Sequence, residues 1–98
     1  MSLKFSKFSN PFHPGEILLE EFIEPLKMSQ RALASKLHWT PRKINEIVKC
    51  KRNITAMTAI DLSKALGTTP EFWLNLQQTW DLAQAYKQKK QDHARDAS

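Results

Sequence analysis

The stretch SQRALASKLHWTPRKINEIVKCKRN, residues 29–53, decides the fold that we expect of this chain. Ser29 and Thr40 are residue types that cap helix N-termini, because a side-chain oxygen can accept from a free backbone N–H of the first turn. Pro41 follows Thr40 at the first helical position, where its missing N–H costs nothing. The stretch therefore predicts two short helices joined by a tight turn near His38.

The apolar side chains of this stretch form one inner face when they are placed on two such helices. They are Leu33, Leu37, Trp39, Ile44 and Ile47, and the small Ala34 lies where the two helices would cross. This is the pattern of a DNA-binding helix-turn-helix, whose second helix enters the major groove. His38 lies in the turn, where such proteins often have glycine, and histidine tolerates positive φ better than most residues. Cys50 lies where a glycine or asparagine often ends the second helix.

Steps of 100° per residue place Ile44, Ile47 and Val48 on the buried side of the second helix and leave its opposite side for DNA. On that side, Arg42 is suited to reading guanine and Asn45 to reading adenine. Glu46 can accept from cytosine N4 or pair with Arg42 one turn earlier, and the sequence leaves both roles open. The predicted base-reading residues are Thr40, Arg42, Lys43, Asn45 and Glu46.

Basic residues concentrate in the same part of the chain. Residues 29–67 carry a net charge of +6, whereas residues 1–28 carry −1 and residues 68–98 carry zero. A basic patch within one folded segment is typical of a surface that binds phosphate. The residues that we expect to contact the DNA backbone are Gln30, Lys49, Lys51, Arg52 and Asn53.

The remaining helices follow from caps and periodicity, and together they predict an all-α domain of five helices. The first helix begins at Pro14, and a fourth begins near Thr55 and ends at Gly67. The first helix is expected to bury Leu19, Phe22, Ile23 and Leu26. We divide the chain into an N-terminal arm (1–12), the DNA-binding domain (13–86) and a flexible basic tail (87–98).

The fifth helix, which begins at Thr69-Pro70, carries more apolar surface than a small helical body needs to cover its core. Two tryptophans on such a helix favour a two-fold dimer interface, for which we predict Trp73, Leu76 and Trp80. The competing interpretation is that both tryptophans pack on the core of their own chain.

The sequence gives no support for an enzyme, a metal site, a cofactor or a membrane protein. The three histidines have no metal-ligand spacing, no nucleophile has a motif-supported base, and no glycine-rich phosphate loop is present. No apolar run approaches the ~18 residues of a membrane span. The single Cys50 has no disulfide partner within the chain, so we expect a reduced, cytoplasmic setting.

Three segments together resemble the HigA family of antitoxins, which belong to the Xre-type, Cro/repressor-like regulators. They are HPGEILLEEFIEPLKMSQRALASKL (13–37), TPRKINEIVKCKRNIT (40–55) and ALGTTPEFWLNLQ (65–77). The resemblance implies a five-helix, lambda-repressor-like fold and a homodimer that binds double-stranded operator DNA at its own promoter. It also implies neutralisation of a HigB-type toxin, a ribosome-dependent mRNA nuclease. His38 and Cys50 depart from the glycines common in the family.

Two other functions remain open at this point. A stand-alone Xre-type repressor would use the same DNA-reading face without a toxin. A protein-interaction module would instead use the acidic stripe of Glu16, Glu20 and Glu24, or the tryptophan-bearing fifth helix, and would bind no specific DNA.

Overall fold

A computed structural model describes residues 11–97, with side chains through residue 92, so residues 1–10 of the predicted arm (1–12) lie outside the described residues. The helices are α1 (Pro14–Ile17), which continues into the π-helical segment η1 (Leu18–Ile23), and α2 (Gln30–Leu37). They are followed by α3 (Pro41–Val48), α4 (Ala56–Leu66) and α5 (Pro70–Ala97). Within residues 11–97 the chain has no strand, so the all-α prediction is confirmed.

Local capping chemistry sets where most of these helices begin. The hydroxyl oxygens of Ser29, Thr40, Thr55 and Thr69 each accept the backbone N–H three residues on, at 2.9, 3.1, 3.3 and 3.1 Å. Each bond satisfies one of the free donors at a helix start. The helix starts predicted at Ser29, Thr40, Thr55 and Thr69 are therefore confirmed.

Left-handed residues end three of the helices. His38 ends α2 with φ 61°, Cys50 follows α3 with φ 63°, and Gly67 ends α4 with φ 73°. The predicted positive φ at His38 is confirmed, and Cys50 occupies the same region of backbone conformation. Neither non-glycine residue disturbs the helix-turn-helix.

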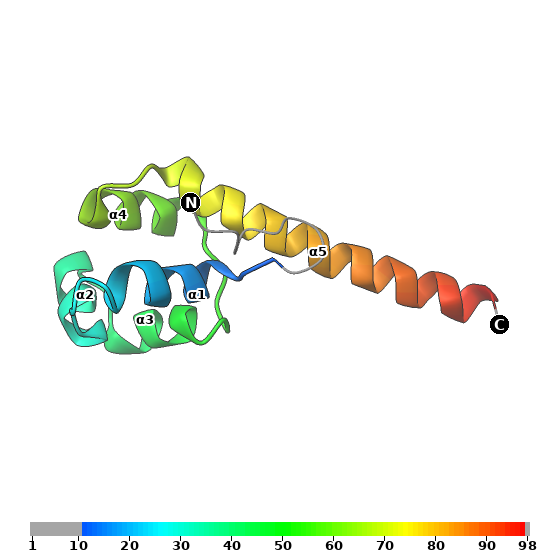
Figure 1. Cartoon of the computed structure of the whole chain (residues 1–98), viewed down its shortest axis with the longest axis horizontal. Coiled ribbons are helices and arrows are strands. Elements are labelled where there is room, and N and C mark those ends of the chain that lie inside the picture. Colours follow the sequence, from blue (N-terminus) through cyan, green and yellow to red (C-terminus); the bar gives the residue numbers. More distant parts are fainter. Residues whose placement is uncertain (1–10, 98) are drawn as a thin grey trace.

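The helices enclose one core beneath the helix-turn-helix (Figure 1). α2 packs on α3, α1 packs on α3 and α5, and α4 lies against both α2 and the start of α5. The fully buried apolar residues come from every helix and include Ile17, Leu33, Ile44, Leu62 and Trp73. The helix-turn-helix thus packs against α1 and α4, which in turn pack against α5.

The predicted core face of the first helix is partly wrong. Ile23 is buried and Leu19 and Phe22 pack against the core, but Leu26 is 59% exposed, while Ile17 and Leu18 are fully buried. The reason is the π-helical segment, in which the N–H of Glu24 bonds to the carbonyl of Leu19, five residues back. A π turn adds a residue to the helix and changes the phase of the side chains after it.

The helix α5 continues past residue 86, where we placed the domain boundary, and runs through Ala97. Its second half extends well beyond the other helices (Figure 1). No helix among the described residues combines the length and apolar character needed to cross a membrane.

Candidate nucleic-acid interface

The exposed side of α3 is the centre of the candidate interface. Ile44, Ile47 and Val48 are buried, while Arg42 and Lys49 are exposed on the other side of the helix. The predicted division of α3 into a core face and an outer face is therefore confirmed. Its hydrogen bonds show how the outer side chains are held.

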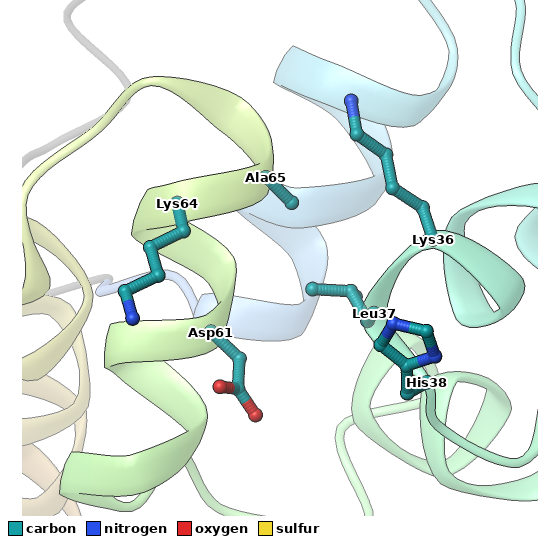
Figure 2. Close-up of a pocket in the computed structure, with 6 residues that line it drawn as sticks. All are labelled: Lys36, Leu37, His38, Asp61, Lys64 and Ala65. Carbon is teal, nitrogen blue, oxygen red and sulfur yellow. The ribbon is translucent and has the colours of Figure 1, made fainter.

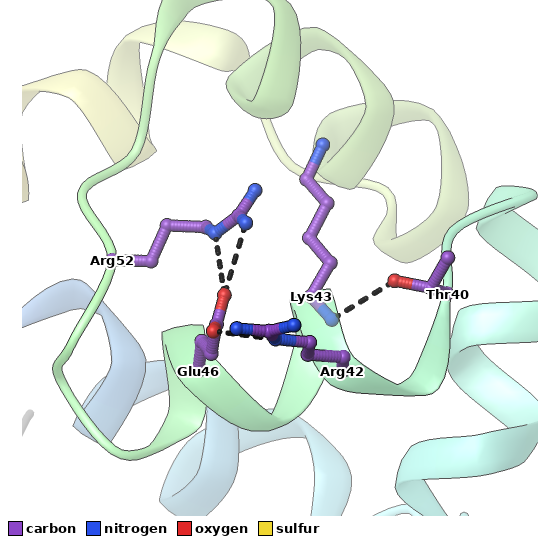
Figure 3. Close-up of polar contacts among 5 residues, drawn as sticks. All are labelled: Thr40, Arg42, Lys43, Glu46 and Arg52. Carbon is purple, nitrogen blue, oxygen red and sulfur yellow. Dashed lines mark hydrogen bonds and ion pairs between the residues drawn. The ribbon is translucent and has the colours of Figure 1, made fainter.

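Glu46 lies between two arginines on this surface (Figure 3). Its Oε2 accepts from Arg42 Nε at 3.1 Å, and its Oε1 accepts from Arg52 Nε at 3.0 Å and Nη2 at 2.9 Å. The hydrogen bond from Arg42 is the largest cause of a lowered pKa at Glu46, and Arg52 adds to it. The carboxylate thus pairs with both guanidinium groups, and its pairing with Arg42 is one of the two roles that the sequence left open.

Asn45 and Gln30 connect the two helices of the motif. The Asn45 Nδ2 donates to the Gln30 Oε1 at 3.3 Å, across 15 residues of sequence. One Nδ2 hydrogen and the Oδ1 of Asn45 remain available, and these are the donor and acceptor that adenine recognition requires. The bond brings a predicted base-reading residue and a predicted backbone-contacting residue into one unit.

Thr40 and Lys43 are partly engaged within the protein. The Thr40 Oγ1 accepts the backbone N–H of Lys43 as a helix cap, and the Lys43 Nζ lies 4.2 Å from the centre of the Trp39 ring (Figure 3 shows the cap). The Trp39 Nε1 in turn donates to the Asp61 Oδ2 at 3.1 Å, which ties the turn to α4. Lys43 is therefore directed along the flank of α3.

The residues predicted to contact phosphate lie at the end of α3 and in the loop that follows it. Lys49, Lys51, Arg52 and Asn53 are all exposed. They form one continuous basic segment next to the outer face of α3, with Arg52 joined to it through Glu46. The structure thus brings the predicted base-reading and backbone-contacting groups to one side of the molecule.

Sequence reasoning missed Gly15, the residue that allows α1 to approach α3. A Cβ at Gly15 would overlap the carbonyl oxygen of Ile47, a backbone atom of the candidate recognition helix. The only signal for this contact in the sequence was a glycine at the second position of a predicted helix, because glycine is unfavourable within helices.

His13, the residue before α1, caps that helix from a buried position. Its Nδ1 accepts the N–H of Gly15 at 2.9 Å, and the Glu16 carboxylate accepts the backbone N–H of His13 in return. The ring is 1% exposed and packs edge-on against Trp80, with ring centres 5.2 Å apart. Burial lowers the pKa of His13, against smaller opposing contributions from Glu16, Asn53 and Asp81.

One of the three predicted dimer residues, Trp73, needs correction. It is fully buried and its Nε1 donates to the Thr68 Oγ1 at 2.7 Å, so it is a core residue and has no surface to offer a partner. Leu76 packs partly against the core, and Trp80 is partly covered by His13, so both keep some exposed surface. Among the described residues of α5, the large exposed apolar side chains are Leu82 and Tyr86, which are 50% and 67% exposed.

A shallow cleft of about 260 Å³ opens on another part of the surface, between the C-terminal ends of α2 and α4 (Figure 2). Lys36, His38 and Lys64 line it together with Asp61, whose carboxylate already accepts from Trp39. None of the residues predicted to contact DNA lines this cleft. Among the described residues, no group of three histidine, cysteine or acidic side chains is placed to hold a metal ion.

Comparison with known proteins gives consistent similarities. A family model described as helix-turn-helix matches residues 19–73. Virulence-associated protein I of Dichelobacter nodosus is 45% identical over 92% of this chain and 84% of its own length. Antitoxin HigA-1 of Vibrio cholerae is 37% identical over 81% of this chain and 77% of its own length. The solved structure of Pseudomonas aeruginosa antitoxin HigA with the higBA promoter has a TM-score of 0.80 at 40% identity, covering 85% of this chain and 90% of that chain.

Proposed function

Because this chain belongs to the helix-turn-helix family of HigA-type antitoxins and transcriptional regulators, we propose that it is the antitoxin of a type II toxin–antitoxin module. In this function it binds operator DNA as a dimer, represses its own operon and neutralises a HigB-type mRNA nuclease. The observation that carries the proposal is the exposed, hydrogen-bonded face of α3, in a chain similar to an antitoxin solved with its promoter. The chain acts by binding and not as an enzyme, in the cytoplasm where its operator is found.

On the DNA, we assign Arg42 and Asn45 to the base edges. Arg42 is held by Glu46 in a position from which its guanidinium can donate two bonds to guanine, and Asn45 retains the groups that adenine requires. Thr40 and Lys43 flank these two at the start of α3, where contacts to bases or nearby phosphates are both within reach. Glu46 acts chiefly by orienting Arg42 and Arg52, because both of its oxygens are occupied.

The backbone contacts come from residues around this face. Lys49, Lys51 and Arg52 supply positive charge at the end of α3, and Gln30 and Asn53 supply neutral donors on either side. Such contacts fix the register of a protein on DNA without reading its sequence. They account for affinity that depends on salt, and the α3 contacts account for preference between sequences.

A dimer is required because one recognition helix reads only one half-site. Two copies with α3 helices about one DNA turn apart, ~34 Å, match a palindromic operator. We place the dimer contact on α5. Its partly exposed residues Leu76 and Trp80 and its more exposed residues Leu82 and Tyr86 would form the apolar part of this contact. An unpaired helix that extends from a small body gains stability when a second copy covers it.

Co-expression tests the antitoxin function. The product of a small basic reading frame next to this gene is induced in cells with or without this chain, and growth is followed. We expect growth arrest by the neighbour alone, relief by this chain, and co-purification of the two proteins. Arrest that persists, with no complex formed, would leave a stand-alone repressor as the function.

A further inference from the structure

Gln77 is a buried polar residue of α5 whose amide group is fully engaged. The side chain is 6% exposed, and its Oε1 accepts the backbone N–H of Ile54 at 2.7 Å. Its Nε2 donates to the Asn53 Oδ1 at 3.2 Å and to the Asp81 Oδ1 at 2.9 Å. Two of the three bonds therefore hold the loop that follows α3, more than twenty residues earlier in the chain.

These partners determine how the Asn53 amide is turned. A backbone N–H can only donate and a carboxylate accepts, so Ile54 and Asp81 fix which end of the Gln77 amide carries the hydrogens. The Nε2 of Gln77 therefore needs an acceptor at Asn53, which places the Oδ1 of Asn53 inward. The bond to Gln77 does not use the Nδ2 donor of Asn53, and Asn53 is an exposed residue.

His13 reinforces the same orientation. Because its Nδ1 accepts from Gly15, the neutral ring carries its proton on Nε2, a buried atom with no hydrogen-bond partner among the described residues. The Asn53 side chain favours the protonated ring and offsets a small part of the lowering of the His13 pKa that burial causes. An inward-facing Oδ1 is compatible with this ring, because an amide oxygen can accept from an imidazole N–H.

We propose that Gln77 is a positioning residue for nucleic-acid binding, which holds Asn53 with its Nδ2 directed outward to donate to a backbone phosphate. The inference rests on the proposed DNA-binding function and adds to it a residue of α5 that does not touch DNA. Gln77 also anchors Ile54, and with it the loop that carries Lys51 and Arg52. The helix to which we assign dimer formation is thereby connected to the backbone-contacting loop.

The test is the isosteric change Gln77→Glu. The glutamate can still accept from Ile54, but it places an acceptor where Nε2 donated, so Asn53 must turn its Nδ2 inward and its Oδ1 toward the DNA. Because the new carboxylate faces Asp81, the change is also made together with Asp81→Asn, which removes that repulsion. Gln78→Glu is the matched control, because Gln78 is exposed and its change to glutamate adds the same charge one residue away.

Binding is measured by fluorescence anisotropy on the chain's own promoter DNA and on random DNA of equal length. We expect Gln77→Glu, alone and with Asp81→Asn, to weaken binding to both DNAs by about tenfold more than Gln78→Glu does, since a hydrogen bond to a charged group is lost. In an Asn53→Ala background, the Gln77→Glu and Gln78→Glu changes should weaken binding equally.

Two results would overturn the inference in different ways. Suppose that the unaltered chain binds its promoter. If Gln77→Glu then weakens binding no more than Gln78→Glu does, or if its effect is just as large in the Asn53→Ala background, Gln77 does not position Asn53. If the unaltered chain does not bind the promoter, the proposed function fails and the role of Gln77 fails with it. Hydrogen exchange at the Ile54 amide reports, without DNA, whether the loop is still anchored in each variant.

Discussion

Replacing Gly15 with alanine should disrupt the contact that sets the position of α3. The added Cβ would meet the carbonyl oxygen of Ile47, and a backbone atom cannot move aside as the end of a flexible side chain can. Relief therefore requires α1 and α3 to separate, which also loosens the core between them. Overpacking of a tight contact costs ~1–3 kcal/mol and occasionally more, and this backbone overlap belongs at or above the upper end.

A loss of about 3 kcal/mol is large against the ~5–15 kcal/mol that stabilises a typical domain. For a domain of this size it corresponds to a fall in Tm of roughly 12–24 °C. Urea unfolding followed by circular dichroism gives the free energy directly, and promoter binding at low temperature shows whether the displaced α3 still functions.

Gly67→Ala is the matched control because the two glycines are needed for different reasons. Gly67 has φ 73° with nothing within 4 Å of an added Cβ, so alanine there costs only the left-handed backbone strain, ~1–2 kcal/mol. If Gly15→Ala is no more destabilising than Gly67→Ala, the close approach of α1 to α3 is not a determinant of the fold.

Three further changes follow from the same structure. The lowered pKa of His13 means that the unfolded chain binds the proton more readily, so the contribution of His13 to the free energy of unfolding should be complete above pH ~6.5 and fall below it by at most ~1.4 kcal/mol per pH unit. His13→Asn, which keeps a capping residue, should flatten this pH dependence in urea unfolding at pH 5–8. An unchanged slope would assign the dependence to other groups. Leu82→Ser with Tyr86→Ser should convert a dimer to a monomer in sedimentation, and an unchanged mass would remove both residues from the interface. His38→Gly should raise the free energy of unfolding by about 0.5–1 kcal/mol. Glycine removes left-handed backbone strain of ~1–2 kcal/mol, but ordering its more flexible backbone costs ~0.5–1 kcal/mol. A loss of stability would show that the imidazole makes a necessary contact.

Most of the fold could be predicted because its determinants are local. Ser29, Thr40 and Thr55 act on backbone groups three residues away, and the buried face of α3 follows from regular helical spacing. Leu26 could not be placed because it follows a π-helical turn, whose extra residue is not apparent in the apolar pattern. An exposed tryptophan and a buried one look alike in sequence, so the burial of Trp73 could be known only once the other helices were in place.

The candidate interface was predictable in its residues but not in their connections. The spacing of Arg42 and Glu46 indicated a possible pair, whereas the second partner, Arg52, approaches Glu46 only because the loop folds back toward α3. Gln77 carried no signal at all, since a glutamine within a helix gives no indication in the sequence of which distant backbone group it bonds.

The central claim is that the outer face of α3 reads operator DNA while the surrounding basic residues hold its backbone. The measurement that tests it most directly is the affinity of the unaltered chain, Arg42→Ala and Lys51→Ala for promoter and random DNA across a salt series. We predict that Arg42→Ala reduces the preference for the promoter by ~5–150-fold, the value of one guanine contact, while Lys51→Ala weakens both DNAs alike and lowers the salt slope by ~1. Equal losses on promoter and random DNA for both variants would contradict the account.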